Sequence, residues 1–546
     1  MQNKNVFDVS GKIVDLRKGE IFTGVVTVED EKIIAVRKSD YVEDQYILPG
    51  FIDSHVHIES SMLIPSEFAR LAVVHGTVAT VSDPHEIANV LGIDGVKYMI
   101  KNGHKVPFKF YFGASSCVPA TTFETAGAVL GPQEIAELLA MDEIRYLSEM
   151  MNFPGVLFGD KEVMEKIAIA KKYGKPVDGH APGLKGEDAR KYIQAGITTD
   201  HECFTMEEAL DKIKYGMKIQ IREGSAARNF EALVGLLKTH PDKVLFCSDD
   251  KHPNDLVKGH INQLVKRAVG KGYDPMTVLR SAVLNPVDHY GLDVGLLQPG
   301  DDADFIVIDN LTDFNVLSTY IEGRQVAENG ESLIGSVPET EPNAFRAEFI
   351  QPEDIAVEAV SGTIRVMEAL DGQLITNNLA LKAKTENGKV APDTERDILK
   401  IVVLNRYQPA RPAVAFIRNF NFKRGAVAST VAHDSHNIIA VGCSDEEIAK
   451  AINLLVEARG GISLVDGRDE HVLPLPVAGL MSAKDGFEIA RDYDIMDMLA
   501  KGLGSKLNAP YMTLSFMALL VIPYLKLSDK GLFDGVKFSF TDLFSD

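Results

Sequence analysis

The chain has 546 residues, 45% of them hydrophobic and 25% charged, which is an ordinary composition for a folded globular protein. Its 57 Lys and Arg against 78 Asp and Glu give a net charge of −21, which disfavours a nucleic-acid partner or an anionic membrane surface. The length is ample for a large core and for about three or four domain-sized units.

The N-terminal segment predicts a small sheet. Residues 5–46 alternate apolar and polar side chains, as in Lys12–Leu16 and Lys32–Val36, a period typical of half-buried antiparallel strands. The first residues, Met1–Asn5, lack the apolar core of a signal peptide. The four cysteines lie far apart and form no Cys-x-x-Cys pair, which suits a reducing compartment, so we expect a cytoplasmic protein.

The next segment carries the most informative pair of residues, His55 and His57. They end a run, Ile47–Ile58, whose first half is apolar enough to be a buried strand. An extended strand sends side chains i and i+2 to the same face, so both imidazoles should point to one spot. Two neutral imidazoles at a buried strand end make half of a divalent-metal site.

Four more ligand-type residues each end a short hydrophobic stretch further along the chain: Glu149, His180, His201 and Asp249. Eight strand-like runs can be counted, with helical patterns such as Lys161–Tyr173 between many of them. The runs are 47–58, 77–83, 109–117, 144–150, 175–180, 197–202, 218–223 and 244–249. Alternating strands and helices predict an α/β fold with a TIM-like (β/α)8 barrel. Active sites of such barrels lie at the C-terminal strand ends, where all six candidate metal ligands fall.

The remainder of the chain predicts two further units. Strands with turns between them fill residues 290–335, as they fill residues 1–46, and the barrel takes 47–289. A polar, Pro-bearing linker, Ser336–Asn343, leads to a separate α+β domain at 347–546. That domain contains a clear helix, Asp445–Ala458, and an apolar stretch, Met512–Leu525, which is shorter than the roughly 20 residues of a membrane span and predicts a buried strand or helix. We therefore expect no membrane association.

Several motifs together resemble a known family. Pro49–Met62, Ser82–Val90, Asp178–Gly183 and Cys247–Pro253 are similar to segments of the amidohydrolase superfamily and, within it, of the bacterial adenine deaminases. The resemblance spans nearly the whole chain, including Val431–Asn437. It implies that the two strand-rich segments beside the barrel pair into one composite β-sandwich like that of ureases.

The resemblance also implies a centre of two divalent metal ions. Many relatives bridge their metals with a carbamylated Lys, but the strand predicted at 144–150 contains no Lys, so we assign the bridge to Glu149. The remaining ligands would be His55, His57, His180, His201 and Asp249. Imidazole and carboxylate ligands without a thiolate suit Zn, Mn or Fe. The bridging carboxylate and the resemblance favour Mn or Fe, with Zn as a further possibility.

The expected reaction is hydrolytic deamination of adenine to hypoxanthine and ammonia in purine salvage. A hydroxide shared by two metal ions would attack C6 of the free base. Asp249 is the expected acceptor of its proton and would protonate the departing ammonia. The ring nitrogen N1 also needs a proton, and Glu59 and Glu86 are both candidates for that acid. A slip of one position, to Asp250, is open for the metal-side carboxylate.

Three further histidines have open roles. His85 follows the second strand-like run and either contacts substrate or holds the loop. His433 and His436 lie in a turn between the strand-like runs Ala426–Ala432 and Asn437–Val441. They reach the site, or bind another metal, if the C-terminal domain covers the barrel mouth. Otherwise they are surface residues of a hairpin.

Two other functions compete with this interpretation. One is a dihydroorotase-like or imidazolone-hydrolysing enzyme, whose anionic substrate would require an Arg clamp, for which Arg222 and Arg228 offer no distinctive pattern. The other is a non-catalytic purine-binding protein, although a complete set of buried ionisable ligands argues against it. The resemblance further implies a homo-oligomer, a dimer or larger. The sequence does not decide between adenine and adenosine.

Overall fold

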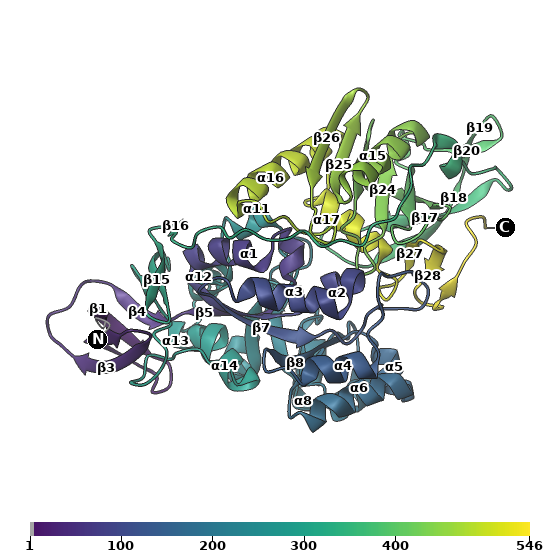
Figure 1. Ribbon diagram of the computed structural model, residues 1–546. Coiled ribbons are helices and arrows are strands. Elements are labelled where there is room, and N and C mark those ends of the chain that lie inside the picture. Colours follow the sequence, from purple (N-terminus) through teal and green to yellow (C-terminus); the bar gives the residue numbers. More distant parts are fainter. Residues whose placement is uncertain (1–4, 546) are drawn as a thin grey trace.

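The computed structural model describes residues 5–545 of the chain. Figure 1 shows three parts: a sheet around the N-terminus, a barrel in the middle, and a mixed α/β part that packs against one end of the barrel. The barrel places the candidate ligands, and the third part covers them.

The first sheet combines strands from two distant segments of the chain. Its order is β16-β15-β14-β13-β4-β1-β2-β3. These strands are β1 (Val6–Asp15), β2 (Glu20–Glu29), β3 (Lys32–Lys38), β4 (Tyr46–Pro49), β13 (Phe305–Ile308), β14 (Val316–Ile321), β15 (Arg324–Glu328) and β16 (Glu331–Ser332). The rings of Phe7 and Tyr320 stack at 5.7 Å although β1 and β14 are not neighbours, so the sheet curls around a shared core. The expected pairing of the two segments is present, whereas the exact domain limits stay predictions.

One predicted strand, 47–58, is in fact two strands that belong to different sheets. The run 47–58 is divided at Gly50 into β4, which pairs with β1 and β13, and β5 (Phe51–Val56), which pairs with β6. Gly50 permits a close approach of the two parts, since a Cβ there would lie 2.2 Å from a methyl group of Val78. Both halves are apolar, and for this reason the hydrophobic pattern alone did not reveal the change of sheet.

The central barrel contains all eight predicted parallel strands, most of them shorter than predicted. They are β5, β6 (Thr77–Ser82), β7 (Lys109–Ala114), β8 (Ile144–Met150), β9 (Val177–Gly179), β10 (Thr199–Asp200), β11 (Lys218–Arg222) and β12 (Val244–Cys247). Parallel bridges Val56–Asp249 and Val177–Ile197 join the five-stranded and three-stranded sheets at both edges. These bridges close the barrel, which confirms the predicted fold class.

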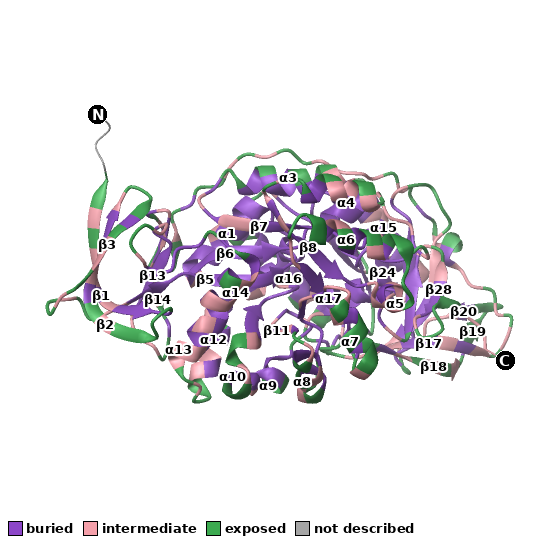
Figure 2. Ribbon diagram, turned by 90° about the horizontal axis from the view of Figure 1, so that it is seen from below, coloured by how far each residue is buried: buried purple, intermediate pink, exposed green. Residues whose placement is uncertain are grey.

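Helices surround the barrel, and Figure 2 shows their buried faces turned toward the strands. The longer ones are α1 (Pro65–Ala72), α3 (Ile93–Gly103), α4 (Pro132–Leu139), α6 (Lys161–Lys172), α7 (Gly186–Gln194), α8 (Met206–Lys214) and α12 (Ile261–Gly270). The predicted α6 illustrates the local cause: the Asp160 carboxylate accepts the Val163 N–H at its start, and its apolar side chains Val163, Ile167 and Ala170 are buried.

The C-terminal part is built on an eight-stranded sheet of order β18-β17-β22-β21-β24-β23-β25-β26. Its strands are β17 (Thr363–Ala369), β18 (Thr376–Lys382), β21 (Leu399–Leu404), β22 (Ala413–Arg418), β23 (Ala426–Ser429), β24 (Ile438–Gly442), β25 (Gly461–Asp466) and β26 (Asp469–Pro474). The predicted helix α15 (Asp445–Ala458) packs on this sheet through Ile448, Ile452 and Leu455. Two further helices are α16 (Gly486–Gly502) and α17 (Pro510–Ser515).

Polar contacts fasten the C-terminal part to the barrel. Arg70 of α1 binds Asp485 at 2.7 Å, and Gly486 N–H donates to Glu67 at 2.9 Å. The predicted linker is extended and is tied to the barrel where Lys105 binds Glu339 at 2.8 Å. As a result, the loop between β23 and β24 is held at the mouth of the barrel.

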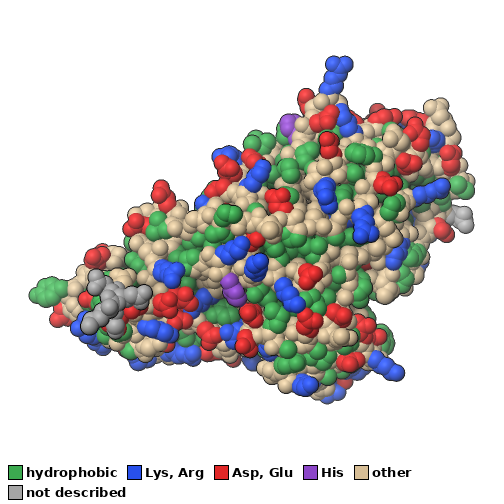
Figure 3. Space-filling view, in the orientation of Figure 1, with side chains coloured by type: hydrophobic (Ala, Val, Ile, Leu, Met, Phe, Trp, Pro, Cys, Tyr) green, Lys and Arg blue, Asp and Glu red, His purple; other side chains and the backbone are tan. Residues whose placement is uncertain are grey.

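The charged surface and the length and polarity of the helices are those expected from the chain's average content of charged and hydrophobic residues. Acidic and basic side chains are interspersed on the face seen in Figure 3. No helix between residues 5 and 545 combines the length and the apolar character needed to cross a membrane.

Candidate metal centre

All six predicted metal ligands meet at the C-terminal ends of the barrel strands. Each is buried, with at most 6% of its surface exposed. The six lie in or just after five of the eight barrel strands, β5, β8, β9, β10 and β12; they are His55, His57, Glu149, His180, His201 and Asp249. The barrel thus gathers residues that are far apart in sequence.

The first group of ligand atoms is formed by His55, His57 and Asp249. The Nε2 atoms of the two histidines are 3.2 Å apart, and Asp249 Oδ1 lies 3.5 Å from the first and 3.3 Å from the second. His57 Nδ1 lies 3.2 Å from the carbonyl oxygen of Asp83. Donation of an Nδ1–H to that carbonyl leaves the Nε2 lone pair facing the group, as a metal ligand requires.

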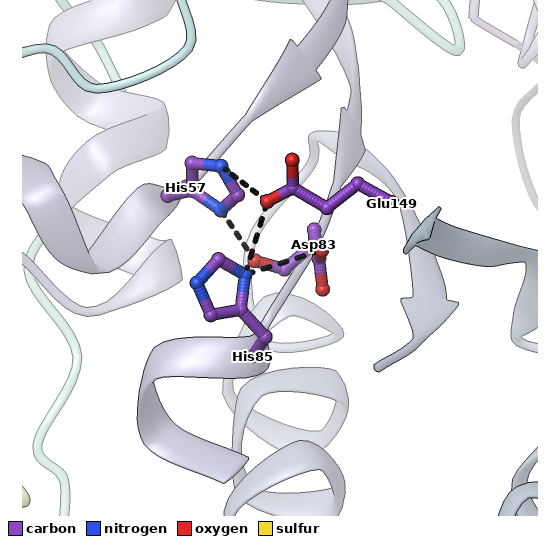
Figure 4. A group of neighbouring side chains, drawn as sticks. All are labelled: His57, Asp83, His85 and Glu149. Carbon is purple, nitrogen blue, oxygen red and sulfur yellow. Dashed lines mark hydrogen bonds and ion pairs between the residues drawn. The ribbon is translucent and has the colours of Figure 1, made fainter. Parts of the chain in front are cut away.

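Glu149 stands between this group and a second one. Its Oε1 lies 3.4 Å from His57 Nε2, whereas its Oε2 lies 2.8 Å from His180 Nδ1 and 3.2 Å from His201 Nε2. Figure 4 shows the Glu149 carboxylate facing His57 and His85. A carboxylate with one oxygen toward each set of histidines has the arrangement of a bridging ligand.

Two residues next to the second group were not predicted. Glu202 Oε1 lies 3.8 Å from His180 Nδ1 and 3.6 Å from His201 Nε2. It also binds Arg222, whose Nη1 lies 2.6 Å from Asp249 Oδ2. Arg222 therefore fixes one oxygen of Asp249 and leaves the other facing the histidine pair.

This donor set fits divalent metal ions. Several groups of buried His, Asp and Glu atoms lie within 4.8 Å of one another, and Glu149 belongs to groups on both sides. The six side chains are buried, and imidazole and carboxylate donors without a thiolate suit Mn, Fe or Zn.

The two candidate acids, Glu59 and Glu86, differ in position. Glu86 lines the cavity in front of the metal ligands, and its Oε1 lies 3.0 Å from Ser60 Oγ and 3.2 Å from His433 Nδ1. Glu59 accepts the N–H of Ile87 at 3.2 Å and is not among the residues that line the cavity. Burial and the nearby charge of Glu86 raise the pKa of Glu59 to about 8.

His85 lies at the rim of the group and connects it to the C-terminal part. Its Nδ1 lies 3.2 Å from Asp83 Oδ2 and 3.5 Å from Glu149 Oε1, and its Nε2 lies 3.6 Å from Asp434 Oδ1. Figure 4 shows the ring beside Asp83 and Glu149. His85 lines the cavity, which is compatible with a role in contacting substrate.

The C-terminal part forms the opposite wall of this cavity. Its lining residues there are Leu374, His433, Asp434, Phe516 and Leu519. The alternative that His433 and His436 are surface residues of a hairpin is wrong, because they are 2% and 0% exposed. His433 stacks on Phe516 with ring centroids 4.4 Å apart. Met512–Leu525, predicted as a buried strand or helix, contains the end of α17 and this aromatic side chain.

Some residues of the site were missed for identifiable reasons. Asp83 and Glu202 each lie within two positions of a predicted residue, so adjacency in sequence was an available signal, and Asp250 is the alternative to Asp249 that the sequence leaves open. Ser60 donates to Asp250 at 2.5 Å, and Asp250 lines the cavity beside Asp249. Asp434 and Phe516 follow no motif of the barrel, and only the packing of the C-terminal part reveals them.

Comparisons with known proteins agree with this architecture. Residues 46–326 match the model of the amidohydrolase family, and residues 373–539 match that of the adenine deaminase C-terminal domain. An adenine deaminase of Sulfurovum sp. is 58% identical over 98% of this chain and 99% of its own length. An adenine deaminase of Salinibacter ruber is 54% identical over 99% of each chain.

Proposed function

Because the chain belongs to the adenine deaminase family of amidohydrolases, we propose that it hydrolyses adenine to hypoxanthine and ammonia. The observation that carries this proposal is the joint match to two family models. One covers the barrel that holds the candidate ligands, and the other covers the C-terminal part, and both parts line the same cavity.

The family is metal-dependent, and we propose that this chain holds two divalent ions, Mn or Fe in preference to Zn. His55, His57 and Asp249 would hold one, His180 and His201 the other, and Glu149 would bridge them. When bound, the ions supply an acidified water as nucleophile near neutral pH. The support is the position of Glu149, with one oxygen toward each set of histidines.

Asp249 is the proposed acceptor of the proton that the attacking water loses. Its Oδ2 is held by Arg222 at 2.6 Å, so the carboxylate keeps a fixed orientation at the end of β12. The same group would return the proton to the amine as ammonia leaves, which is general base and then general acid catalysis.

Glu86 is the proposed donor of a proton to ring nitrogen N1, in preference to Glu59. Glu86 lines the cavity, and the proton that it passes to N1 would come from His433, whose Nδ1 lies 3.2 Å from its Oε1. Glu59 instead supports the backbone of the helix α2 (His85–Leu91) through the N–H of Ile87. Addition to C6 needs such a donor because the ring nitrogen takes up negative charge as the bond forms.

A small neutral purine suits the cavity better than an anionic substrate does. Phe516 offers an aromatic face for stacking. Arg222, the cation on the cavity wall, is already flanked by Glu202 and Asp249, so it is poorly placed to clamp the anionic substrate of a dihydroorotase-like enzyme.

The test is the absorbance change from adenine to hypoxanthine with enzyme reconstituted with Mn²⁺, run beside adenosine and with His180→Ala as the inactive control. We expect turnover of adenine that His180→Ala abolishes together with part of the bound metal. Enzyme that carries a full complement of metal and leaves adenine unchanged would contradict the proposal.

We further propose a homo-oligomer in the cytoplasm, as the family resemblance implies. All four cysteines are unpaired, which suits a reducing compartment. Light scattering of the purified chain tests the oligomer, and a mass equal to that of one chain would contradict it.

A further inference from the structure

We propose that Asp434, in the loop between β23 and β24, accepts a hydrogen bond from the ring N–H that adenine carries at N9. A riboside has lost this hydrogen, so Asp434 would select the free base over adenosine. This inference rests on the proposed function and assigns a substrate-recognising residue to the C-terminal part.

The side chain of Asp434 is buried at the wall of the cavity. Asp434 is 2% exposed and lines the cavity on the side opposite the barrel strands. Its Oδ1 lies 3.6 Å from His85 Nε2 and 3.9 Å from His433 Nδ1. Its Oδ2 is buried and has no hydrogen-bond partner within the described part of the chain. A buried carboxylate oxygen without a donor is costly, and a ligand N–H in the cavity would remove that cost.

Asp434 lies beyond His85 as seen from the candidate metal ligands. The imidazole of His85 lies between them, with Nδ1 3.5 Å from Glu149 Oε1 and Nε2 3.6 Å from Asp434 Oδ1. A flat bicyclic base that presents its C6 amine to the Glu149 side therefore extends its five-membered ring toward the loop. N9 is the hydrogen-bearing atom at that far edge.

The imidazoles near Asp434 leave one of its oxygens free. His85 Nε2 and His433 Nδ1 lie 3.6 Å and 3.9 Å from Oδ1. The nearby carboxyl of Glu124 accepts the N–H and the hydroxyl of Thr121. Oδ2 of Asp434 has no donor among residues 5–545, so it can accept an N–H from a ligand.

The main alternative is that the buried polar groups near Asp434 bind a third metal ion and not the purine. Glu86, His433 and His436 form a group of possible ligands for such an ion. The backbone N–H of Ala432 donates to His436 Nδ1 at 3.2 Å. The neutral ring of His436 therefore keeps its hydrogen on Nε2, so that nitrogen has no lone pair for a metal. Asp434 is not part of that group.

The experiment compares wild type, Asp434→Asn and Asp434→Ala with adenine and 9-methyladenine as substrates. Asp469→Asn is the matched control, since it removes an exposed carboxylate of the same sheet. An amide has one acceptor oxygen and cannot serve both His85 and the purine. We expect kcat/KM for adenine to fall about 10- to 100-fold in Asp434→Asn. In wild type, 9-methyladenine should be at least ~100-fold poorer than adenine, and this ratio should shrink in both variants.

Two measurements separate recognition from a structural role. Metal content should stay at the wild-type value in both variants, and binding of the product hypoxanthine, measured by calorimetry, should weaken by a similar factor. Variants with wild-type kcat/KM for adenine, an unchanged preference over 9-methyladenine, or a lower metal content would each overturn the inference. Wild type that fails to deaminate adenine would contradict the proposed function itself, whereas active wild type with insensitive Asp434 variants contradicts the role of Asp434 alone.

Discussion

Nδ1 of His433, in the C-terminal part, lies 3.2 Å from Oε1 of Glu86, in the barrel. Burial would raise the pKa of Glu86, but His433 and His436 outweigh burial and hold it well below its ordinary value. Burial would lower the pKa of His433, yet Glu86 raises it to about 9. The pair is therefore charged near neutral pH, so the proton proposed for N1 rests on His433, a residue of the C-terminal part.

Replacement of His433 tests this contact. Because His433→Gln removes the charged partner of Glu86 and keeps a side chain that can donate a hydrogen bond, we expect kcat to fall about 10- to 100-fold. Metal content should remain unchanged, since neither residue is a proposed ligand. His471→Gln, in β26 of the same sheet, is the control. Steady-state kinetics that match wild type would contradict a role for His433.

Replacement of Glu149 tests the bridge. Glu149→Gln removes the charge that faces both sets of histidines, so we expect loss of at least one ion per chain and a drop in activity of more than about 1,000-fold. Glu137→Gln, which changes an exposed glutamate paired with Lys97, should bind metal normally. Metal analysis after dialysis provides the measurement, and a variant that retains wild-type metal content would show that Glu149 is no ligand.

Stability should depend on pH through Lys526. This lysine donates to the carbonyls of Leu374 and Phe516, two cavity residues, at 2.7 and 2.9 Å, and burial lowers its pKa to about 7. The folded state then binds fewer protons than the unfolded state between about pH 7 and the ordinary lysine pKa of 10.5. Unfolding takes up a proton there, so this group makes the protein more stable as pH rises, by about 1.4 kcal/mol per pH unit.

Lys526→Met removes this dependence. Urea unfolding midpoints of variant and wild type, compared at pH 7.5 and pH 9.5, should show wild type gaining stability relative to the variant at the higher pH. An equal difference at both values would mean that Lys526 is protonated in the folded protein across this range.

Arg222 should stabilise the metal-free protein. It lies between Glu202 and Asp249, and it is 1% exposed. Arg222→Met leaves two buried carboxylates without their cation, so we expect the metal-free variant to lose about 3–5 kcal/mol of unfolding free energy. Arg228→Met, at a side chain 55% exposed, should be nearly neutral. Thermal unfolding in the presence of a chelator gives the comparison, and equal effects of both substitutions would contradict the expectation.

Much of the barrel could be predicted from sequence because five of its eight strands end at or near a candidate metal ligand. The spacing of His55 and His57 indicates a metal-binding pair. The other four candidates, each at the end of an apolar run, are Glu149, His180, His201 and Asp249. The eight strand positions followed from the same runs. The break at Gly50 was not predictable, because the apolar character continues across it and only hydrogen-bonding partners change.

The wall of the cavity opposite the strands was beyond prediction for another reason. The position of the loop after β23 depends on how one domain packs against another, through contacts such as Arg70 with Asp485. No local pattern encodes such contacts. The choice between Glu59 and Glu86 depended on the same packing, since it is His433 that distinguishes their surroundings.

The most direct measurement of the central claim is a titration of the metal-free enzyme with Mn²⁺, followed by both metal analysis and the conversion of adenine to hypoxanthine. We predict no turnover without metal and a rise to a plateau at two ions per chain. Undiminished turnover of adenine by the metal-free enzyme, or a plateau reached at one ion, would contradict it.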